Sequence, residues 1–222
     1  MSVTAAPPRP MVFGGPSLSL VPAELLTGFE LRPPVKRGEL AALQSEAPRT
    51  VLVVDGLFGG SMAVTPLECR QLLSLGWQLL GCSSIGALRA SELWSAGMIG
   101  VGTVYQLLRL EKIPADADVA VSYSAGSWQE LGVSVVQVRA IVARLTSPHP
   151  AAQLVQAARR IHWLERSWAD VFKAWSLLGV DAETLAKAKA MSANEALHPK
   201  KTDALEAIRL LCAEQWVFPP KE

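Results

Sequence analysis

Short apolar runs of strand type alternate with helical patterns over the first 126 residues. The runs cover residues 11–13, 50–54, 77–80 and 119–123. The run at 50–54 is rich in β-branched residues and has no polar interruption, as is typical of a strand buried on both faces. A strand, helix, strand, helix order with connections of this length favours parallel pairing. We therefore predict an α/β fold with a short, mostly parallel sheet flanked by helices.

The pattern becomes wholly helical after about residue 127. Glycine and proline residues separate the helical segments, which we place at 133–145, 151–164, 167–178, 182–191 and 203–216. The tryptophans of these segments are expected to form a core, although an interface would use them too. We predict three parts: a flexible N-terminal tail at 1–10, an α/β core at 11–126 and an all-helical C-terminal lobe at 127–222.

Cap residues mark where several of these helices begin. Thr65 and Glu68 have the spacing of a capping box, with a proline between them at the first helical position. Thr103 is the expected cap of the following helix, and Asp181 and Thr202 are suited to cap helices of the lobe.

Composition excludes several classes of function. The chain has 222 residues and a net charge of +1, which argues against nucleic acid or a membrane surface as a partner. Its three cysteines and three histidines have no metal-ligand spacing, so we expect no metal and no cofactor. The start of the chain is rich in proline and lacks the apolar stretch of a signal peptide. No apolar run approaches the ~20 residues that span a bilayer. We expect a soluble cytoplasmic protein.

A turn that carries serine joins the strand at 77–80 to the next helix. Small residues follow Gly81 as far as Gly86, and Ser84 lies between the strand and the helix. The order Ser84, Ile85, Gly86 matches half of the nucleophile-elbow pattern, in which a serine stands clear of the sheet. The first free N–H groups of the helix then point towards its oxygen. An ordinary strand-to-helix turn has the same appearance.

Three loops at the carboxyl ends of strands are expected to share one crevice, because open parallel sheets place ligands at that edge. These loops are 14–19, 55–56 and 82–86, and together they carry Ser17, Ser19, Asp55, Ser83 and Ser84. The chain has neither a GxGxxG motif nor a Walker A motif, so a nucleotide-binding domain is a weakly supported alternative.

A serine nucleophile needs a base, and the first half of the chain has no histidine. A lysine can take that role when burial or neighbouring cations favour its uncharged form. Lys36 follows a rigid pair of prolines and lies between Arg32 and Arg37, so it is the candidate. A solvated basic turn is the competing interpretation.

Several stretches together resemble the TfuA-like core family. They are residues 12–19, 32–38, 54–58 and 81–102, with a shorter match at 201–205. The resemblance implies a role beside YcaO, the ATP-dependent enzyme that activates peptide backbone amides for thioamidation in the biosynthesis of peptide natural products. It implies that the protein hydrolyses the thiocarboxylated C-terminus of a ThiS-like sulfur carrier, releases sulfide, and helps YcaO engage the precursor peptide. It also implies a hydrolase-like site with a Ser–Lys pair.

On this chain the resemblance places the nucleophile at Ser84 and the base at Lys36, with Ser17 and then Ser83 as alternative nucleophiles. The remaining candidates would bind the oxyanion or the substrate: Gly14, Gly15, Ser17, Ser83, Ile85, Arg37, Asp55 and Arg89. Among them, the N–H groups near Ile85 and from Gly14 to Ser17 are expected to form an oxyanion hole. Arg37 or Arg89 would neutralise the sulfur, and Asp55 would either orient Lys36 or cap a loop. The non-enzymatic alternative is an adaptor that binds YcaO and recruits the peptide.

Overall fold

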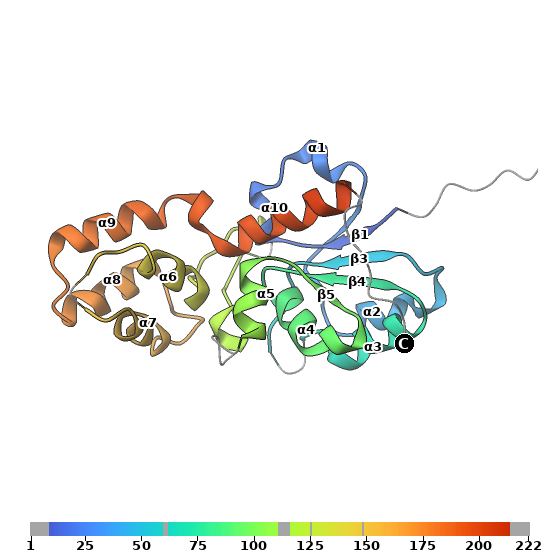
Figure 1. Ribbon diagram of the computed structural model, residues 1–222, viewed down its shortest axis with the longest axis horizontal. Helices are drawn as coiled ribbons and strands as arrows, with labels where there is room; N and C mark the ends of the chain where they lie inside the picture. The colour runs from blue at the N-terminus through green and yellow to red at the C-terminus, as the bar shows by residue number, and fades with distance from the viewer. Residues whose placement is uncertain (1–8, 60–61, 111–115, 125, 148, 214–222) are drawn as a thin grey trace, which may run out of the picture.

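The protein is described by a computed structural model, shown in Figure 1, which covers residues 9–59, 62–110, 116–124, 126–147 and 149–213. Most of the predicted tail at 1–10 therefore lies outside the described residues. The five strands form one parallel sheet in the order β2-β1-β3-β4-β5. Their bounds are Met11–Phe13 for β1, Glu30–Arg32 for β2, Thr50–Val53 for β3, Gln78–Gly81 for β4 and Ile99–Gly100 for β5. The predicted α/β class with a parallel sheet is confirmed.

The strand expected at 119–123 does not form. The chain there makes a 3-10 turn, Asp116–Asp118, and then an irregular segment in which only Tyr123 pairs, through an isolated antiparallel bridge to Glu130. Val119 packs instead between helices, against Ala87, Val104 and Val136. β5, which lies directly after the turn at Gly97, forms the edge of the sheet instead.

Alternate residues of each strand face two separate cores, as the period of two along a strand requires. Met11, Val51 and Leu79 face three helices: α2 (Glu39–Ala42), α3 (Pro66–Ser74) and α4 (Ile85–Leu93). Val12 and Leu52 face the other side, which is covered by α1, Ala23–Leu26, and α10, Pro199–Cys212. Figure 1 shows the sheet between these two layers. α5, Gly102–Arg109, packs beside α4 and α10 at the β5 edge.

Some helix starts follow local sequence rules and others do not. Thr65 caps α3 in a full capping box, accepting from the Glu68 N–H at 3.2 Å, and Asp181 caps α9; both predictions are confirmed. α10 begins earlier than expected, because Pro199 takes the first helical position and His198 is the cap. Thr202 therefore lies inside that helix, and its hydroxyl donates to backbone carbonyls.

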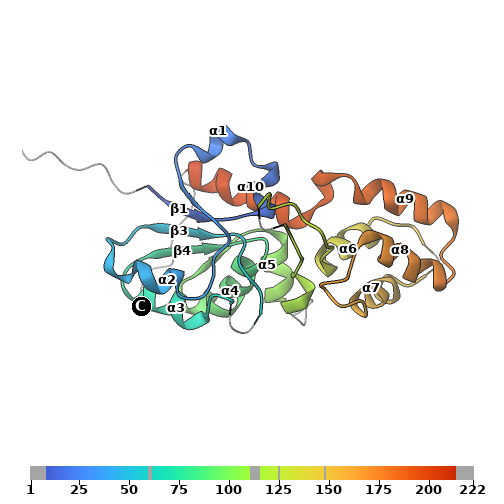
Figure 2. The same ribbon diagram turned by 180° about the vertical axis from the view of Figure 1, so that it is seen from behind.

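Four helices form the C-terminal lobe, which lies beyond one end of the sheet in Figures 1 and 2. They are α6 (Val135–Val142), α7 (Ala151–Arg159), α8 (Trp168–Leu177) and α9 (Ala182–Ser192). Their shared core contains Trp175, whose side chain is fully buried and donates through Nε1 to the Leu154 carbonyl at 2.9 Å. Trp168 and Phe172 stack beside it, so these tryptophans serve mainly as core. Trp216 lies outside the described residues.

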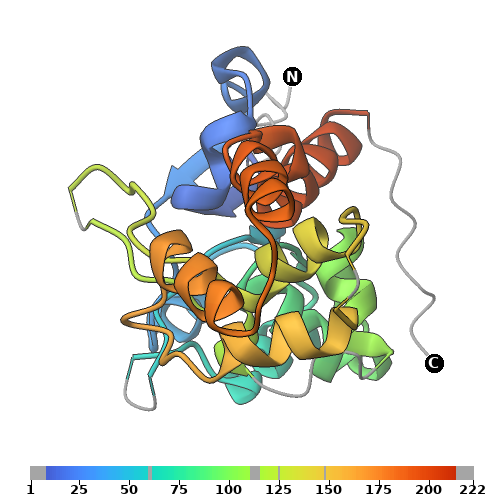
Figure 3. The ribbon, with the colours of Figure 1, turned by 90° about the vertical axis from the view of Figure 1, so that its left-hand side faces the viewer.

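α10 leaves this lobe and returns to the sheet, as Figure 1 shows; Figure 3 views the molecule from the end at which the lobe lies. Ala204, Ala207, Ile208 and Leu211 form its buried face against β1, β3 and β4. The expected division at residues 126 and 127 therefore does not separate two packing units, because the last helix completes the core of the first part. This return brings the start of α10 to the carboxyl ends of the strands.

Candidate functional site

The connections reverse direction between β1 and β3, because β2 lies on one side of β1 while the later strands add on the other. Open parallel sheets bind ligands at such a reversal, outside the carboxyl ends of the strands. The loop after β1, Asp55 after β3 and the serine turn after β4 all lie at this edge, as predicted.

Asp55 binds the loop after β1 through three hydrogen bonds. Its carboxylate accepts from the Gly15 N–H at 2.9 Å, from the Ser17 N–H at 3.0 Å and from Ser17 Oγ at 2.7 Å. Burial raises the pKa of Asp55, and the positive charge of Lys200 and the bonds from Ser17 oppose that rise. Of the two roles considered for Asp55, these contacts are those of a loop cap.

The prediction of an oxyanion hole in the β1 loop is wrong. The Gly14 N–H donates to the Arg32 carbonyl at 3.1 Å, and the Gly15 and Ser17 N–H groups donate to Asp55. Pro16 has no N–H, so every donor of this loop is already used. Ser17 is also fully buried with its hydroxyl committed to Asp55, which leaves it poorly placed as a nucleophile.

The serine turn has the backbone of a tight elbow. Ser83 has a φ of 65°, which is uncommon for a residue with a side chain, and Ser84 is the N-cap of α4. Gly86 is required next, because a Cβ there would lie 1.8 Å from the Val53 carbonyl oxygen. The helix thus starts in direct contact with the sheet.

Two polar groups of this elbow have no hydrogen-bond partner within the described part of the chain. One is Ser84 Oγ, on a residue that is 4% exposed; the other is the N–H of Ile85, the first residue of α4. A free hydroxyl next to a free N–H at a helix N-terminus is the arrangement that an attacking serine and its oxyanion donor require. The Ile85 N–H is therefore free to bind a ligand at this position.

The predicted base, Lys36, lies apart from this arrangement. Val35 points inward and pairs with Gly56, and by alternation Lys36 points outward. Its side chain is 57% exposed, and Nζ lies 3.8 Å from a carboxylate oxygen of Glu39. The dry environment that a lysine base needs is thus absent around Lys36, and the solvated basic turn describes its surroundings.

Lys200, in the first turn of α10, is the functional candidate that sequence reasoning missed. Among the described residues it is the one lysine with a fully buried side chain. Its Nζ forms an ion pair with Glu130 at 3.2 Å, and its carbonyl accepts from Ser83 Oγ at 2.6 Å. In the sequence, the one feature that points to Lys200 is its position directly after Pro199, at the start of a helix.

Glu130 joins this lysine to His198, whose Nε2 lies 2.8 Å from the second carboxylate oxygen. Gln137 of α6 contacts both His198 and Glu130, so the cluster also ties the lobe to the core. Burial alone would raise the pKa of Glu130, but Lys200 and His198 hold it well below its usual range. Glu130 is thus a carboxylate, and it pairs with Lys200 and His198 in the resting protein.

One cavity adjoins the elbow at Ile85, and a second lies between the β1 loop and the lobe. The first, of about 420 Å³, is lined by Ile85, Arg37, Arg89 and Trp163, which brings both predicted arginines to the start of α4. Arg89 also forms an ion pair with Glu92 and donates to the Val64 carbonyl, and Arg37 donates to the Ala63 carbonyl. The other cavity, of about 460 Å³, lies towards the lobe; its lining includes Ser19, Trp128, Glu130 and His198.

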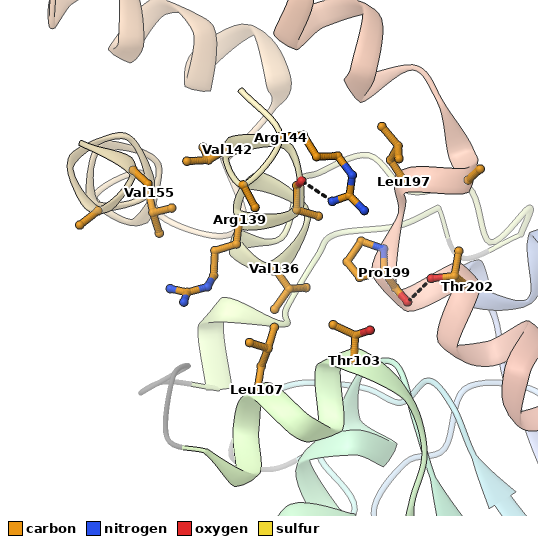
Figure 4. Close-up of a pocket in the computed structure, with 15 residues that line it drawn as sticks. Thr103, Leu107, Val136, Arg139, Val142, Arg144, Val155, Leu197, Pro199 and Thr202 are labelled. Carbon is orange, nitrogen blue, oxygen red and sulfur yellow. Dashed lines mark hydrogen bonds between the residues drawn. The ribbon is translucent and has the colours of Figure 1, made fainter. Parts of the chain in front are cut away.

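A third hollow, of about 540 Å³, lies between the core and the lobe and is mostly apolar. Figure 4 shows its walls: Thr103 and Leu107 from α5, Val136 and Val142 from α6, Val155 from α7, Leu197 from the 3-10 turn before α10, and Pro199 and Thr202 from the start of α10, with Arg139 and Arg144 beside them. It is separate from the elbow, and none of the predicted site residues lines it.

Fold and site together define a parallel α/β domain with a serine elbow at the carboxyl edge of its sheet, completed by a helix that returns from a helical lobe. The family described as TfuA-like protein matches residues 55–167, and the chain belongs to this family. TfuA-like proteins are associated with YcaO-related thioamidation. The matched region includes Asp55, Ser84 and Glu130 and ends before Lys200. No curated protein matches the chain. Within the described residues no helix has both the length and the apolar character needed to cross a membrane.

Proposed function

We propose that this protein is a Ser–Lys hydrolase that serves a YcaO enzyme in peptide thioamidation. Its substrate is the thiocarboxylated C-terminus of a ThiS-like sulfur carrier, and its product is hydrosulfide delivered beside YcaO, which acts on the precursor peptide. One observation carries the proposal: the unbonded Ser84 hydroxyl lies next to the unbonded Ile85 N–H at the start of α4.

Ser84 Oγ attacks the thiocarboxylate carbon, and the developing oxyanion receives the Ile85 N–H and the positive end of α4. A preorganised donor of this kind contributes about 3 kcal/mol to the stability of the transition state. Arg37 and Arg89 add positive charge at the cavity beside Ile85. The carbon–sulfur bond then breaks, which leaves an ester on Ser84.

A proton must move from Ser84 to the sulfur, because hydrosulfide is a far better leaving group than the bare sulfide ion. Since Lys36 lies in solvent beside Glu39, we assign this transfer to Lys200, which is buried and held against the elbow through its carbonyl. The Lys200 ammonium donates its proton to the departing sulfur and takes the proton of Ser84. Water then cleaves the ester, and the carrier leaves as a carboxylate.

The experiment is to mix the purified protein with the thiocarboxylated carrier and measure hydrosulfide release. Wild type is expected to turn over, and Ser84→Ala is expected to lose at least about a hundredfold in rate, as removal of a nucleophile typically does. Folding of the variant and its complex with YcaO are checked in parallel. Unchanged release by a folded Ser84→Ala protein would refute the assignment.

A second candidate is a non-catalytic adaptor that binds YcaO and recruits the peptide. The apolar hollow between α5, α6 and α7 favours it, because exposed apolar concavities mark binding surfaces and this one lies away from the elbow. On this reading, Ser84→Ala leaves thioamidation by the complex unchanged, while Leu107→Asp on the wall of the hollow weakens the complex. The two variants therefore separate catalysis from docking.

A further inference from the structure

Two hydrogen-bond donors are sealed in the interior beside Asp55 and Glu130 without an acceptor of good geometry among the described residues. They are the Tyr123 hydroxyl and Lys200 Nζ, and Nζ has only its ion pair with Glu130. Buried polar groups in native proteins are almost always paired with protein, water or ligand. Two such donors in one region indicate a place for an acceptor.

Backbone pairing and ring contacts hold Tyr123 in this region. Tyr123 and Glu130 face each other in an antiparallel bridge, which directs their side chains to the same side. Glu130 in turn binds Lys200 through its side chain, so one residue connects the backbone of Tyr123 to the lysine. The Tyr123 ring lies 5.6 Å from the ring of Trp128, which is held at a φ of 56° and lies over Gly15.

The nearby carboxylates of Asp55 and Glu130 already accept hydrogen bonds, except at one oxygen of Glu130. All three hydrogen bonds to Asp55 come from the β1 loop, and one oxygen of Glu130 is taken by His198 and Gln137. Burial, with the negative charge of Asp55, raises the pKa of Tyr123 to about 12, so its hydroxyl keeps its proton and stays a donor. The other oxygen of Glu130, Oε1, has no hydrogen bond of good geometry and lies 3.2 Å from Lys200 Nζ, so the Tyr123 hydroxyl is the donor for which the described residues offer no acceptor.

The cavity of about 460 Å³ lies beside this place: Trp128 and Glu130, the neighbours of Tyr123, line it, whereas Tyr123 and Lys200 lie behind them. Ammonium and hydroxyl donors together bind an anion better than a neutral group. We infer that the Tyr123 hydroxyl and the Lys200 ammonium form the subsite for the anionic sulfur of the thiocarboxylate, with Tyr123 as a substrate-binding residue. The identity of the anion rests on the proposed function.

The test measures binding without turnover, in a Ser84→Ala background, by calorimetry with the thiocarboxylated carrier. Adding Tyr123→Phe removes one oxygen and keeps the ring against Trp128; it is expected to weaken binding by roughly tenfold or more, as for a lost hydrogen bond to a charged group. Tyr105→Phe is the matched control at the chain's other tyrosine and is expected to leave the affinity unchanged. The same carrier with a C-terminal amide should bind with little dependence on Tyr123, because it lacks the charge.

Equal affinity with tyrosine and phenylalanine at position 123 would overturn the inference and would indicate a structural water as the acceptor. An equal loss with the amide carrier, or with Tyr105→Phe, would overturn it too, because the effect would not depend on the anion. If wild type releases no hydrosulfide while the Tyr123-dependent affinity persists, the proposed hydrolysis fails and the anion subsite stands. Absence of any binding of the thiocarboxylated carrier to the Ser84→Ala protein would remove the subsite itself.

Discussion

Ser83 Oγ donates a 2.6 Å hydrogen bond to the carbonyl oxygen of Lys200, a residue 117 positions further along the chain. The bond joins the serine elbow after β4 to the first turn of α10. It places the backbone of the buried lysine at the turn that also carries Ser84. The candidate site is therefore assembled from both ends of the protein, and its integrity depends on the docking of α10.

Ser17→Ala is expected to leave hydrosulfide release within about threefold of wild type. The Ser17 hydroxyl is fully buried and donates to Asp55, so its loss acts on stability. A hydrogen bond to a charged partner is worth about 1.5–3 kcal/mol, and chemical denaturation should show a loss of that size. A stable variant without activity would instead make Ser17 the nucleophile.

Lys200→Met is expected to abolish release and to lower the free energy of unfolding by about 3–5 kcal/mol, because Glu130 is left buried without its cation. A double variant with Glu130→Gln should recover part of the stability and none of the activity. Lys36→Met, at an exposed position, is the control and should change both quantities little. Normal release by the stable double variant would exclude Lys200 from the reaction, and loss of release in Lys36→Met alone would return the role to Lys36.

Gly86→Ala is expected to destabilise the protein by several kcal/mol, because its Cβ would overlap the Val53 carbonyl of β3. The elbow would have to move away from the sheet. Gly28→Ala is the matched control: no atom lies within 4 Å of its Cβ position, so its effect should stay within about 1 kcal/mol. Thermal unfolding of the two variants measures the difference, and equal melting temperatures would contradict the close contact between α4 and the sheet.

Asp203 makes stability depend on pH in a defined window. It accepts from the Thr103 and Val104 N–H groups at the start of α5, and burial raises its pKa from 3.8 to about 6. A pKa raised by folding means that the folded protein binds the proton more tightly than the unfolded chain. The contribution of Asp203 to stability is therefore full below pH 3.8 and is lost as the pH rises to about 6. A pKa shift of about two units corresponds to roughly 3 kcal/mol of folding free energy.

The measurement is the free energy of unfolding between pH 4 and pH 7 for wild type and Asp203→Asn. The decrease in the free energy of unfolding with rising pH that Asp203 causes should disappear in the variant. In both proteins the lowered pKa of Glu130 makes the free energy of unfolding increase with pH at the acidic end. Identical pH profiles of the two proteins would show that burial does not perturb Asp203.

Much of the fold was predictable because it rests on short-range rules. The unbroken apolar run of β3, the alternation of its neighbours and the capping box at Thr65 each involve residues within four positions. β2 and β5 escaped prediction because three and two residues carry too little pattern. The strand expected at 119–123 failed because its apolar residues found partners on helices instead of on another strand.

Taken alone, the amino-acid sequence determined the parallel α/β core, the serine turn that precedes α4, and the helical lobe, since these depend on local geometry and periodicity. Tertiary structure decided which lysine is buried, which N–H groups remain free, and which residue caps α5. Those outcomes join residues far apart, as Ser83 to Lys200 or Thr103 to Asp203, 100 positions away. Whether a charge lies in solvent or in the interior depends on what packs over it, and here that is α10 returning across the sheet.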